Sequence, residues 1–276
     1  MAEEIREHET AGAGPGGIDT TVATPARIYD YFLGGKDNYA VDRAAAEEIM
    51  KAVPEAPTSA RANRAFLRRA VRYMAGAGIT QFVDIGAGLP TQGNVHEVAQ
   101  EIRPESRIVY VDNDPVVLVH GRALLEANAD VAVIAGDLRR PEEILADPRL
   151  SELIDLDEPV GVLLIAILHF IGDEEEPFDL VKRLMEPLPA GSHLAISHGY
   201  EGGMVEGTSE HARGVYRRST SAIHSRDPRT VERFFAGADI AEPGVVWVPE
   251  WGLGEGEPTP MEPERTHFLG AVARKR

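Results

Sequence analysis

The feature of this 276-residue chain that most constrains its fold is an alternation of short apolar runs with helix-compatible segments. Four runs rich in β-branched residues predict strands, at 81–85, 107–111, 131–134 and 160–165. The segments between them predict helices, at 95–102, 115–128 and 141–153. Such alternation is typical of βαβ units, in which helices cover both faces of a parallel sheet.

The regions before and after this alternation have other sequence patterns. Residues 1–20 are rich in Glu, Gly and Ala and predict a mobile tail, and residues 21–78 predict a helical extension. Its helices are expected at 28–34, ending at Gly34, at 42–50 and at 58–75. Beyond the alternation we expect helices at 177–188 and from 227, and strands at 193–197, 245–248 and 267–272. We therefore predict one α/β domain over 79–276 after the extension, rather than two domains.

Composition excludes several kinds of site. The chain has no cysteine, so disulfides, thiolate catalysis and Cys-based metal centres are excluded, and we predict no metal site. The longest apolar run, 160–168, is far shorter than the roughly 20 residues that cross a bilayer. The acidic N-terminus lacks the apolar centre of a signal peptide. We expect a cytoplasmic protein with no membrane partner.

The charge of the chain bears on its partners. A formal net charge of −17 repels nucleic acid unless a local basic patch overrides it. The candidate patch is four arginines at helical spacing, which we interpret as a solvated face: Arg61, Arg64, Arg68 and Arg72. The expected partner is a small molecule and not nucleic acid, and a homo-oligomer stays open.

A glycine pair, Gly86 and Gly88, follows the first predicted strand. Glycines permit a tight turn there and let backbone amides approach a ligand. The dinucleotide fingerprint would need a third glycine where Thr91 stands. Asp84, two residues before the pair, gives instead the D-x-G-x-G layout of methyltransferases, in which the acid helps to hold the methionine end of S-adenosylmethionine.

Two further acids end the next two predicted strands. Asp112 is placed to accept both hydroxyls of a ribose, which would also suit a nicotinamide dinucleotide. Asp137 is placed to accept from the amino group of an adenine. Each acid alone could be a turn residue. The three acids together, in order after three successive strands, favour S-adenosylmethionine as the cofactor.

Two histidines follow later strands. His169 ends the fourth predicted strand, beside the expected methyl group, and is our candidate general base or substrate-orienting residue. The alternative is a histidine that only bonds neighbouring backbone, and the same two interpretations hold for His198. The chain lacks an Asn-Pro-Pro-Tyr motif, which disfavours methylation of nucleobases.

Three segments, 24–39, 82–91 and 109–115, together resemble a family of actinobacterial proteins. That family was long a domain of unknown function and is now classed among the S-adenosylmethionine-dependent methyltransferases. Further matches at 136–137, 167–170, 242–246 and 270–274 extend the resemblance over nearly the whole chain after residue 20. Pro90 stands where many methyltransferases have a third glycine, and it stiffens the loop.

The resemblance implies a Rossmann-like class I methyltransferase fold, a seven-stranded mostly parallel sheet with helices on both faces. The implied strand order is 3-2-1-4-5-7-6, with the last strand antiparallel. S-adenosylmethionine would bind there, with Asn113 against the adenine. The predicted cofactor residues are Asp84, Gly86, Ala87, Gly88, Asp112, Asn113, Asp137, Leu138 and Ala166.

The segment 27–39 has no role in the minimal fold, and we predict that it folds over the cofactor as a lid. Arg27 would then meet the methionine carboxylate. The substrate side would be lined by Tyr31, Asn38, Tyr39 and His198. The alternative is a helix that packs its aromatic residues on the core.

The predicted function is methyl transfer from S-adenosylmethionine to a small molecule, with S-adenosylhomocysteine as product and His169 as the candidate base. One alternative is a non-catalytic module that binds S-adenosylmethionine. Another is a nicotinamide-dependent oxidoreductase, which Thr91 and Asp137 disfavour.

Overall fold

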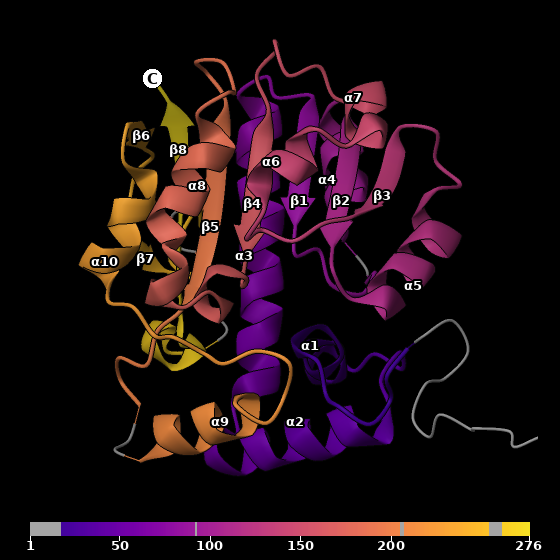
Figure 1. Cartoon of the computed structure of the whole chain (residues 1–276). Helices are drawn as coiled ribbons and strands as arrows, with labels where there is room; N and C mark the ends of the chain where they lie inside the picture. Colours follow the sequence, from indigo (N-terminus) through magenta and orange to yellow (C-terminus); the bar gives the residue numbers. More distant parts are fainter. Residues whose placement is uncertain (1–17, 92, 205–206, 254–260) are drawn as a thin grey trace, which may run out of the picture.

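The computed structural model describes residues 18–91, 93–204, 207–253 and 261–276 (Figure 1). Most of the predicted mobile tail lies outside these residues. Strands in the described part form one sheet in the order β3-β2-β1-β4-β5-β8-β6, with β7 paired to β8. Their bounds are β1 Gln81–Ile85, β2 Arg107–Asp112, β3 Val131–Ala135, β4 Gly161–Ile165, β5 His193–Gly199, β6 Ala238–Ile240, β7 Val246–Trp247 and β8 Phe268–Lys275.

The topology confirms the predicted class. Strands β1 to β5 pair in parallel, and β8 is antiparallel to β5 and β6. The two-residue β7 makes an eighth strand where seven were expected. Strand β6 was not predicted, because its three residues are not a continuous apolar run.

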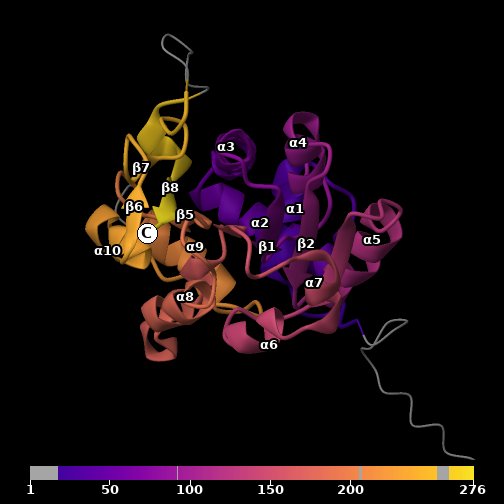
Figure 2. The same cartoon turned by 90° about the horizontal axis from the view of Figure 1, so that it is seen from above.

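Helices cover both faces of the sheet (Figure 2). One face carries α3 (Ala56–Gly76), α4 (Val95–Ile102) and α5 (Pro115–Leu125). The other carries α6 (Pro141–Leu145), α7 (Pro148–Leu153), α8 (Pro177–Met185) and α10 (Pro228–Glu232). The single helix predicted over 141–153 is two helices, because Pro148 starts a new one and the Asp147 side chain accepts from the Arg149 N–H as its cap.

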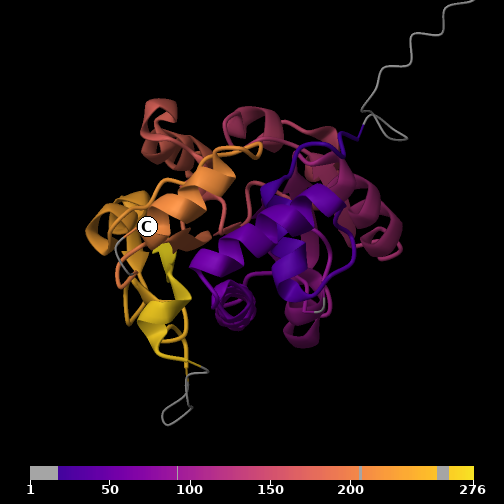
Figure 3. The ribbon, with the colours of Figure 1, turned by 90° about the horizontal axis from the view of Figure 1, so that it is seen from below.

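Three helices lie together beyond the carboxyl ends of the parallel strands, and we call them the cap (Figures 1 and 3): α1 (Pro25–Leu33), α2 (Ala40–Ala52) and α9 (Thr208–Tyr216). They bury Ile28, Phe32, Ile49 and Tyr216 in a small core of their own. Helix α2 begins earlier than predicted, and Asp42 in its first turn accepts from the Tyr39 N–H at 2.8 Å. Helix α9 was not predicted, since its sequence is largely polar.

No helix within the described residues combines the length and the apolar character that crossing a bilayer requires.

Candidate active site

A cavity of about 650 Å³ lies between the carboxyl ends of the strands and the cap. Its size is that of a site for drug-sized ligands. The loops after β1, β2 and β3 form one end, which we call the cofactor end, and the cap with η1 (Leu168–Phe170) and β8 forms the other, the cap end. The predicted site residues that line it are Asp84, Gly86, Ala87, Gly88, Asp112, Asn113, Asp137, Leu138, Ala166 and His169.

The loop after β1 requires its glycines. Gly86 and Gly88 have φ angles of +74° and +67°, a region that side chains rarely adopt. A Cβ atom at Gly86 would lie 2.6 Å from Cδ1 of Ile167. The N–H groups of Gly86 and Ala87 donate to the Val111 carbonyl, which ties this loop to β2. The backbone here can therefore approach a ligand closely.

Asp112 holds the two neighbouring loops together. Its Oδ2 accepts from the Gly88 N–H and its Oδ1 from the Asp114 N–H, both at 2.9 Å. A carboxylate has about four lone-pair sites, so each oxygen can still accept from a ribose hydroxyl. Burial raises the pKa of Asp112 to about 6. This acid is fixed in place before any ligand arrives.

The other two acids lie in different environments. Asp84 is buried at the end of β1, and burial raises its pKa to about 7, against the opposing charge of Arg64. Asp137 is more exposed, and its Oδ1 accepts from the Arg139 N–H at 3.0 Å. Its Oδ2 lies 3.4 Å from Nδ2 of Asn113, next to the predicted adenine position. The three acids line one end of one cavity, as their spacing predicted.

Arg64 of α3 also lines the cavity, and sequence reasoning missed it. Its Nη2 donates to Oγ1 of Thr91 at 2.8 Å, whereas its buried Nε has no hydrogen-bond partner. Guanidinium groups bind carboxylates well. The interpretation of this arginine as part of a solvated face was wrong. The available signal was its place next to Ala60 and Leu67, which are buried on the same helix.

His169 lines the cavity, and its hydrogen bonds determine which ring nitrogen carries the proton. The Gly199 N–H donates to Nδ1 at 3.1 Å, and Nε2 has no partner among the described residues. Burial lowers the pKa of His169 well below its usual value, so the ring is neutral. Since Nδ1 accepts, Nε2 carries the proton. This tautomer offers a hydrogen-bond donor, which differs from the general base that we predicted.

Ala166, at the end of β4, has an unusual backbone. Its φ is +57°, and its N–H donates to the hydroxyl of Ser197 at 2.9 Å. Left-handed conformations of residues other than glycine are found where the surrounding structure enforces them, often at ligand sites. The residue lines the cavity beside the glycine loop.

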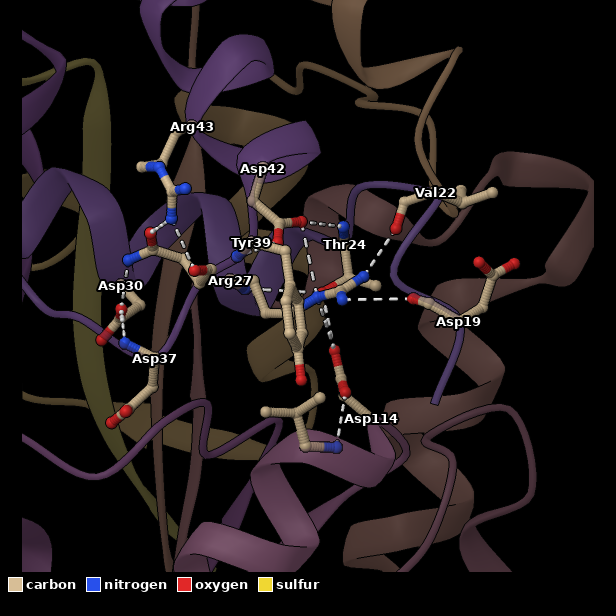
Figure 4. A network of polar contacts seen from close by, with 12 residues as sticks. Asp19, Val22, Thr24, Arg27, Asp30, Asp37, Tyr39, Asp42, Arg43 and Asp114 are labelled. Atoms are coloured by element: carbon tan, nitrogen blue, oxygen red, sulfur yellow. Dashed lines mark hydrogen bonds and ion pairs between the residues drawn. The ribbon is translucent and has the colours of Figure 1, made fainter. Parts of the chain in front are cut away.

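Arg27 is not among the residues that line the cavity and lies instead in a network of polar contacts (Figure 4). It is 1% exposed and forms ion pairs with Asp42 at 3.4 Å and Asp114 at 3.8 Å. Its guanidinium also donates to Oγ1 of Thr24 at 2.9 Å and to the Val22 carbonyl at 2.6 Å. These partners link the cap to α5, and they leave no described access to a methionine carboxylate.

The other predicted substrate-side residues also lie away from the cavity. The Tyr31 hydroxyl donates to Glu47, and Asn38 bonds Asp30 within the cap. Tyr39 packs under the Arg27 guanidinium. His198 is fully buried, with Nδ1 against the Gly199 carbonyl and Nε2 against Arg226. The placement of these four side chains differs from the prediction because each is committed to the packing of the protein.

Comparison with known proteins identifies the family. The model of the S-adenosyl methyltransferase family matches residues 12–276. The chain belongs to this family. A DUF574 family protein from Streptomyces avermitilis is 40% identical, with a TM-score of 0.88 over 93% of this chain and 99% of its own. A Thermobifida fusca protein, provisionally described as a methyltransferase, is 38% identical, with a TM-score of 0.88 over 95% of this chain and 98% of its own.

The other comparisons show the fold alone or find no match. The plantazolicin methyltransferase, 9% identical with a TM-score of 0.52, covers 91% of this chain and 95% of its own and shows the same fold. A search of the curated proteins finds no match. Family membership confirms the predicted S-adenosylmethionine cofactor and methyltransferase activity. It is incompatible with the nicotinamide alternative and favours the enzyme over a non-catalytic module.

Proposed function

We propose that this methyltransferase acts on a small molecule that binds under the cap. The observation that carries the proposal is that one cavity joins the three acids of the cofactor end to an apolar space between α1, α3 and α9. A net charge of −17 further disfavours a nucleic-acid acceptor. The cytoplasmic location stays a prediction.

At the cofactor end, we propose that Asp112 receives the ribose hydroxyls and Asp137, beside Asn113, the adenine amino group. Gly86, Ala87 and Gly88 would lie against the cofactor through their backbone, since this loop has room for no side chain at Gly86. Leu138 and Ala166 would complete the walls.

We assign the methionine end to Asp84 and Arg64. The unpartnered Nε of Arg64 is a buried donor close to Asp84, and the pair matches the ammonium and carboxylate of an amino acid. Arg64 takes the role that we first predicted for Arg27. With both ends held by these residues, the methyl group would be presented to the cap end, where positioning of the acceptor would account for most of the rate.

When bound, S-adenosylmethionine supplies a methyl group: an acceptor lone pair bonds the carbon, the carbon–sulfur electrons return to sulfur, and the acceptor proton leaves to solvent. His169 contributes a donated hydrogen bond from Nε2, which orients the acceptor. This assignment replaces a general base with a positioning residue.

The experiment is incubation of the protein with methyl-labelled S-adenosylmethionine and a cell extract, followed by separation of low-mass from macromolecular products. We expect label in the low-mass fraction and an equal amount of S-adenosylhomocysteine. Asp112→Ala should abolish both, because it removes the ribose contact and leaves two backbone N–H groups unpaired. Label in macromolecules contradicts a small-molecule acceptor, and cofactor binding without turnover contradicts the enzyme.

A further inference from the structure

The cap end of the cavity has a wall of aromatic rings in contact. The His169 ring lies 5.9 Å from Phe268 and 4.3 Å from Phe170, which lies 5.7 Å from Tyr216. All four line the cavity, from β8, η1 and α9. Rings at these spacings pack best against another ring, stacked or edge-on. The wall therefore favours a flat ligand.

One face of α3 forms another wall. Ala56, Ala60, Asn63 and Leu67 line the cavity and recur at the spacing of a single helix face. The two alanines leave space toward the cap, and Arg64 is the next residue toward the cofactor end. Asn63 therefore lies at the boundary between the predicted cofactor position and the aromatic wall.

The hydrogen bonds of Asn63 determine which of its polar atoms is left unpaired. Its Nδ2 lies 3.0 Å from the Tyr29 hydroxyl, which itself donates to the Ala60 carbonyl at 3.0 Å. A hydroxyl has one proton, so the amide must be the donor to Tyr29. Oδ1 is then left without a partner, although Asn63 is fully buried. An unpaired buried acceptor favours a ligand that brings a donor.

Charge restricts the ligand further. The ionised lining side chains near the aromatic wall are Glu201 and Arg213, which pair with each other, and Arg139, which donates to the Phe170 carbonyl and pairs with Glu175. Burial lowers the pKa of both His169 and His267, which are therefore neutral. With no unpaired charge to meet it, an ionised ligand would lose its hydration without compensation.

We propose that the methyl acceptor is an uncharged, planar aromatic molecule whose O–H or N–H group donates to Oδ1 of Asn63. This deepens the proposed function and rests on it. Asn63 is a specificity residue in this scheme: it accepts from the ligand and is itself oriented by Tyr29.

The test uses protein saturated with S-adenosylhomocysteine and three probes of similar size, measured by titration calorimetry. They are 2-naphthol, 2-methoxynaphthalene, which lacks the donor, and 2-decalol, which keeps the hydroxyl but is not planar. We expect 2-naphthol to bind about tenfold more tightly than each of the others. Equal affinities for 2-naphthol and its methyl ether overturn the role of Asn63, and equal affinities for 2-naphthol and 2-decalol overturn the aromatic class.

Two substitutions locate the preference. Asn63→Leu removes the acceptor and should abolish the preference for 2-naphthol over its ether. Asn63→Asp should retain it, because the carboxyl keeps an acceptor oxygen whether it is ionised and bonded by Tyr29 or protonated and donating to Tyr29. Loss of the preference in both variants would show that Asn63 only supports Tyr29, and would overturn the proposal.

The cofactor provides the remaining control. Affinity for S-adenosylhomocysteine should be unchanged in Asn63→Asp and Asn63→Leu, and a tenfold loss would place Asn63 in the cofactor site instead. If Asn63→Leu does not fold, the proposal is still tested by whether the wild type prefers 2-naphthol over its methyl ether and whether Asn63→Asp retains that preference. Normal cofactor binding without a preference for 2-naphthol overturns this proposal alone. Label in macromolecules, in the experiment with the cell extract, overturns the proposed function instead.

Discussion

The two ends of the cavity are built in opposite ways. At the cofactor end, polar groups come from consecutive strand ends and are held by backbone bonds, as Asp112 is by Gly88 and Asp114. At the cap end, aromatic side chains come from segments far apart in the chain, and Oδ1 of Asn63 has no partner. The ribose acid of the cofactor end is thus held in place before binding, and the unpaired Nε of Arg64 is a donor that still needs an acceptor. At the cap end the unpaired group is an acceptor, so the ligand there must supply a donor.

The largest expected effect is on stability, at Arg27, which links the cap to α5 beside the cofactor end. Arg27→Met should lower the free energy of unfolding by about 3–5 kcal/mol, because it leaves the buried Asp42 carboxylate without its ion pair. Urea denaturation measures this. Arg43→Met is the matched control in the same cap, since Arg43 is exposed, and it should cost less than about 1 kcal/mol. Equal small losses would mean that Arg27 does not hold the cap to α5.

The second prediction tests whether Arg64 or Arg27 binds the carboxylate of the cofactor. Arg64→Gln should weaken binding of S-adenosylhomocysteine roughly ten- to a hundredfold, because a charged hydrogen bond to the carboxylate is lost. It should leave binding of 5′-methylthioadenosine, which has no carboxylate, nearly unchanged. Calorimetry with both ligands gives the contrast.

The control for that experiment is Arg72→Gln on the same helix, where the side chain is 51% exposed and pairs with Glu101. It should change neither affinity. Folded Arg27→Met protein should bind the two ligands with an unaltered ratio. A ratio that changes in Arg27→Met and not in Arg64→Gln would restore the carboxylate role that the sequence first indicated for Arg27.

The third prediction concerns pH. Burial raises the pKa of Asp84 to about 7 in the folded protein, above its unfolded value of about 3.8. This group therefore stabilises the free protein most below pH 4, and that contribution is lost as the pH rises through 7. Thermal unfolding between pH 5 and 8 should show a loss of stability in both proteins, because Asp112 contributes to each, but the loss in the wild type should exceed that in Asp84→Asn by the order of 1–3 kcal/mol.

Binding of the cofactor should change the protonation of Asp84. The ammonium and sulfonium charges of S-adenosylmethionine favour ionised Asp84, so binding at pH 6 to 7 should release protons. Calorimetry in buffers of different ionisation enthalpy measures the release, which should shrink in Asp84→Asn. Proton uptake on binding would contradict the assignment of Asp84 to the methionine end.

The same contrast explains what sequence reasoning could reach. Asp84, Asp112 and Asp137 end successive strands, so the parallel sheet alone brings them to one edge. Arg27 and Arg64 show the opposite case. Both lie on helices, and which of them faces the cavity depends on how α1 and α3 pack, which spacing along the chain does not reveal.

The cap end was beyond sequence reasoning for a related reason. Tyr216 lies on α9, whose polar sequence predicts no buried face, and it meets Phe170 only through the tertiary fold. His169 was found by its place shortly after the fourth predicted strand, although it lies in η1 and not in β4. Its tautomer depends on the Gly199 N–H of the neighbouring strand, so its role as a donor required the structure.

The smallest expected effect lies at Ala166, where the cofactor end holds a residue in a costly conformation. Ala166→Gly should raise the free energy of unfolding by about 1 kcal/mol or less, because the left-handed backbone no longer opposes a Cβ atom while glycine loses more entropy on folding. The same change should weaken S-adenosylhomocysteine binding severalfold, since a freer loop is less preorganised. Thermal unfolding and calorimetry on one preparation measure both.

Ser197→Ala is the partner experiment, because it removes one of the two acceptors of the Ala166 N–H, the Ser197 hydroxyl, and keeps the other, the Ser197 carbonyl, as well as the Cβ atom of Ala166. It should lower stability by about 1 kcal/mol and weaken cofactor binding in the same direction as Ala166→Gly. Opposite changes in stability with similar losses of affinity would show that the fixed loop, and not stability, determines cofactor binding at this end. Unchanged affinity in both variants would mean that the conformation of Ala166 serves the fold alone.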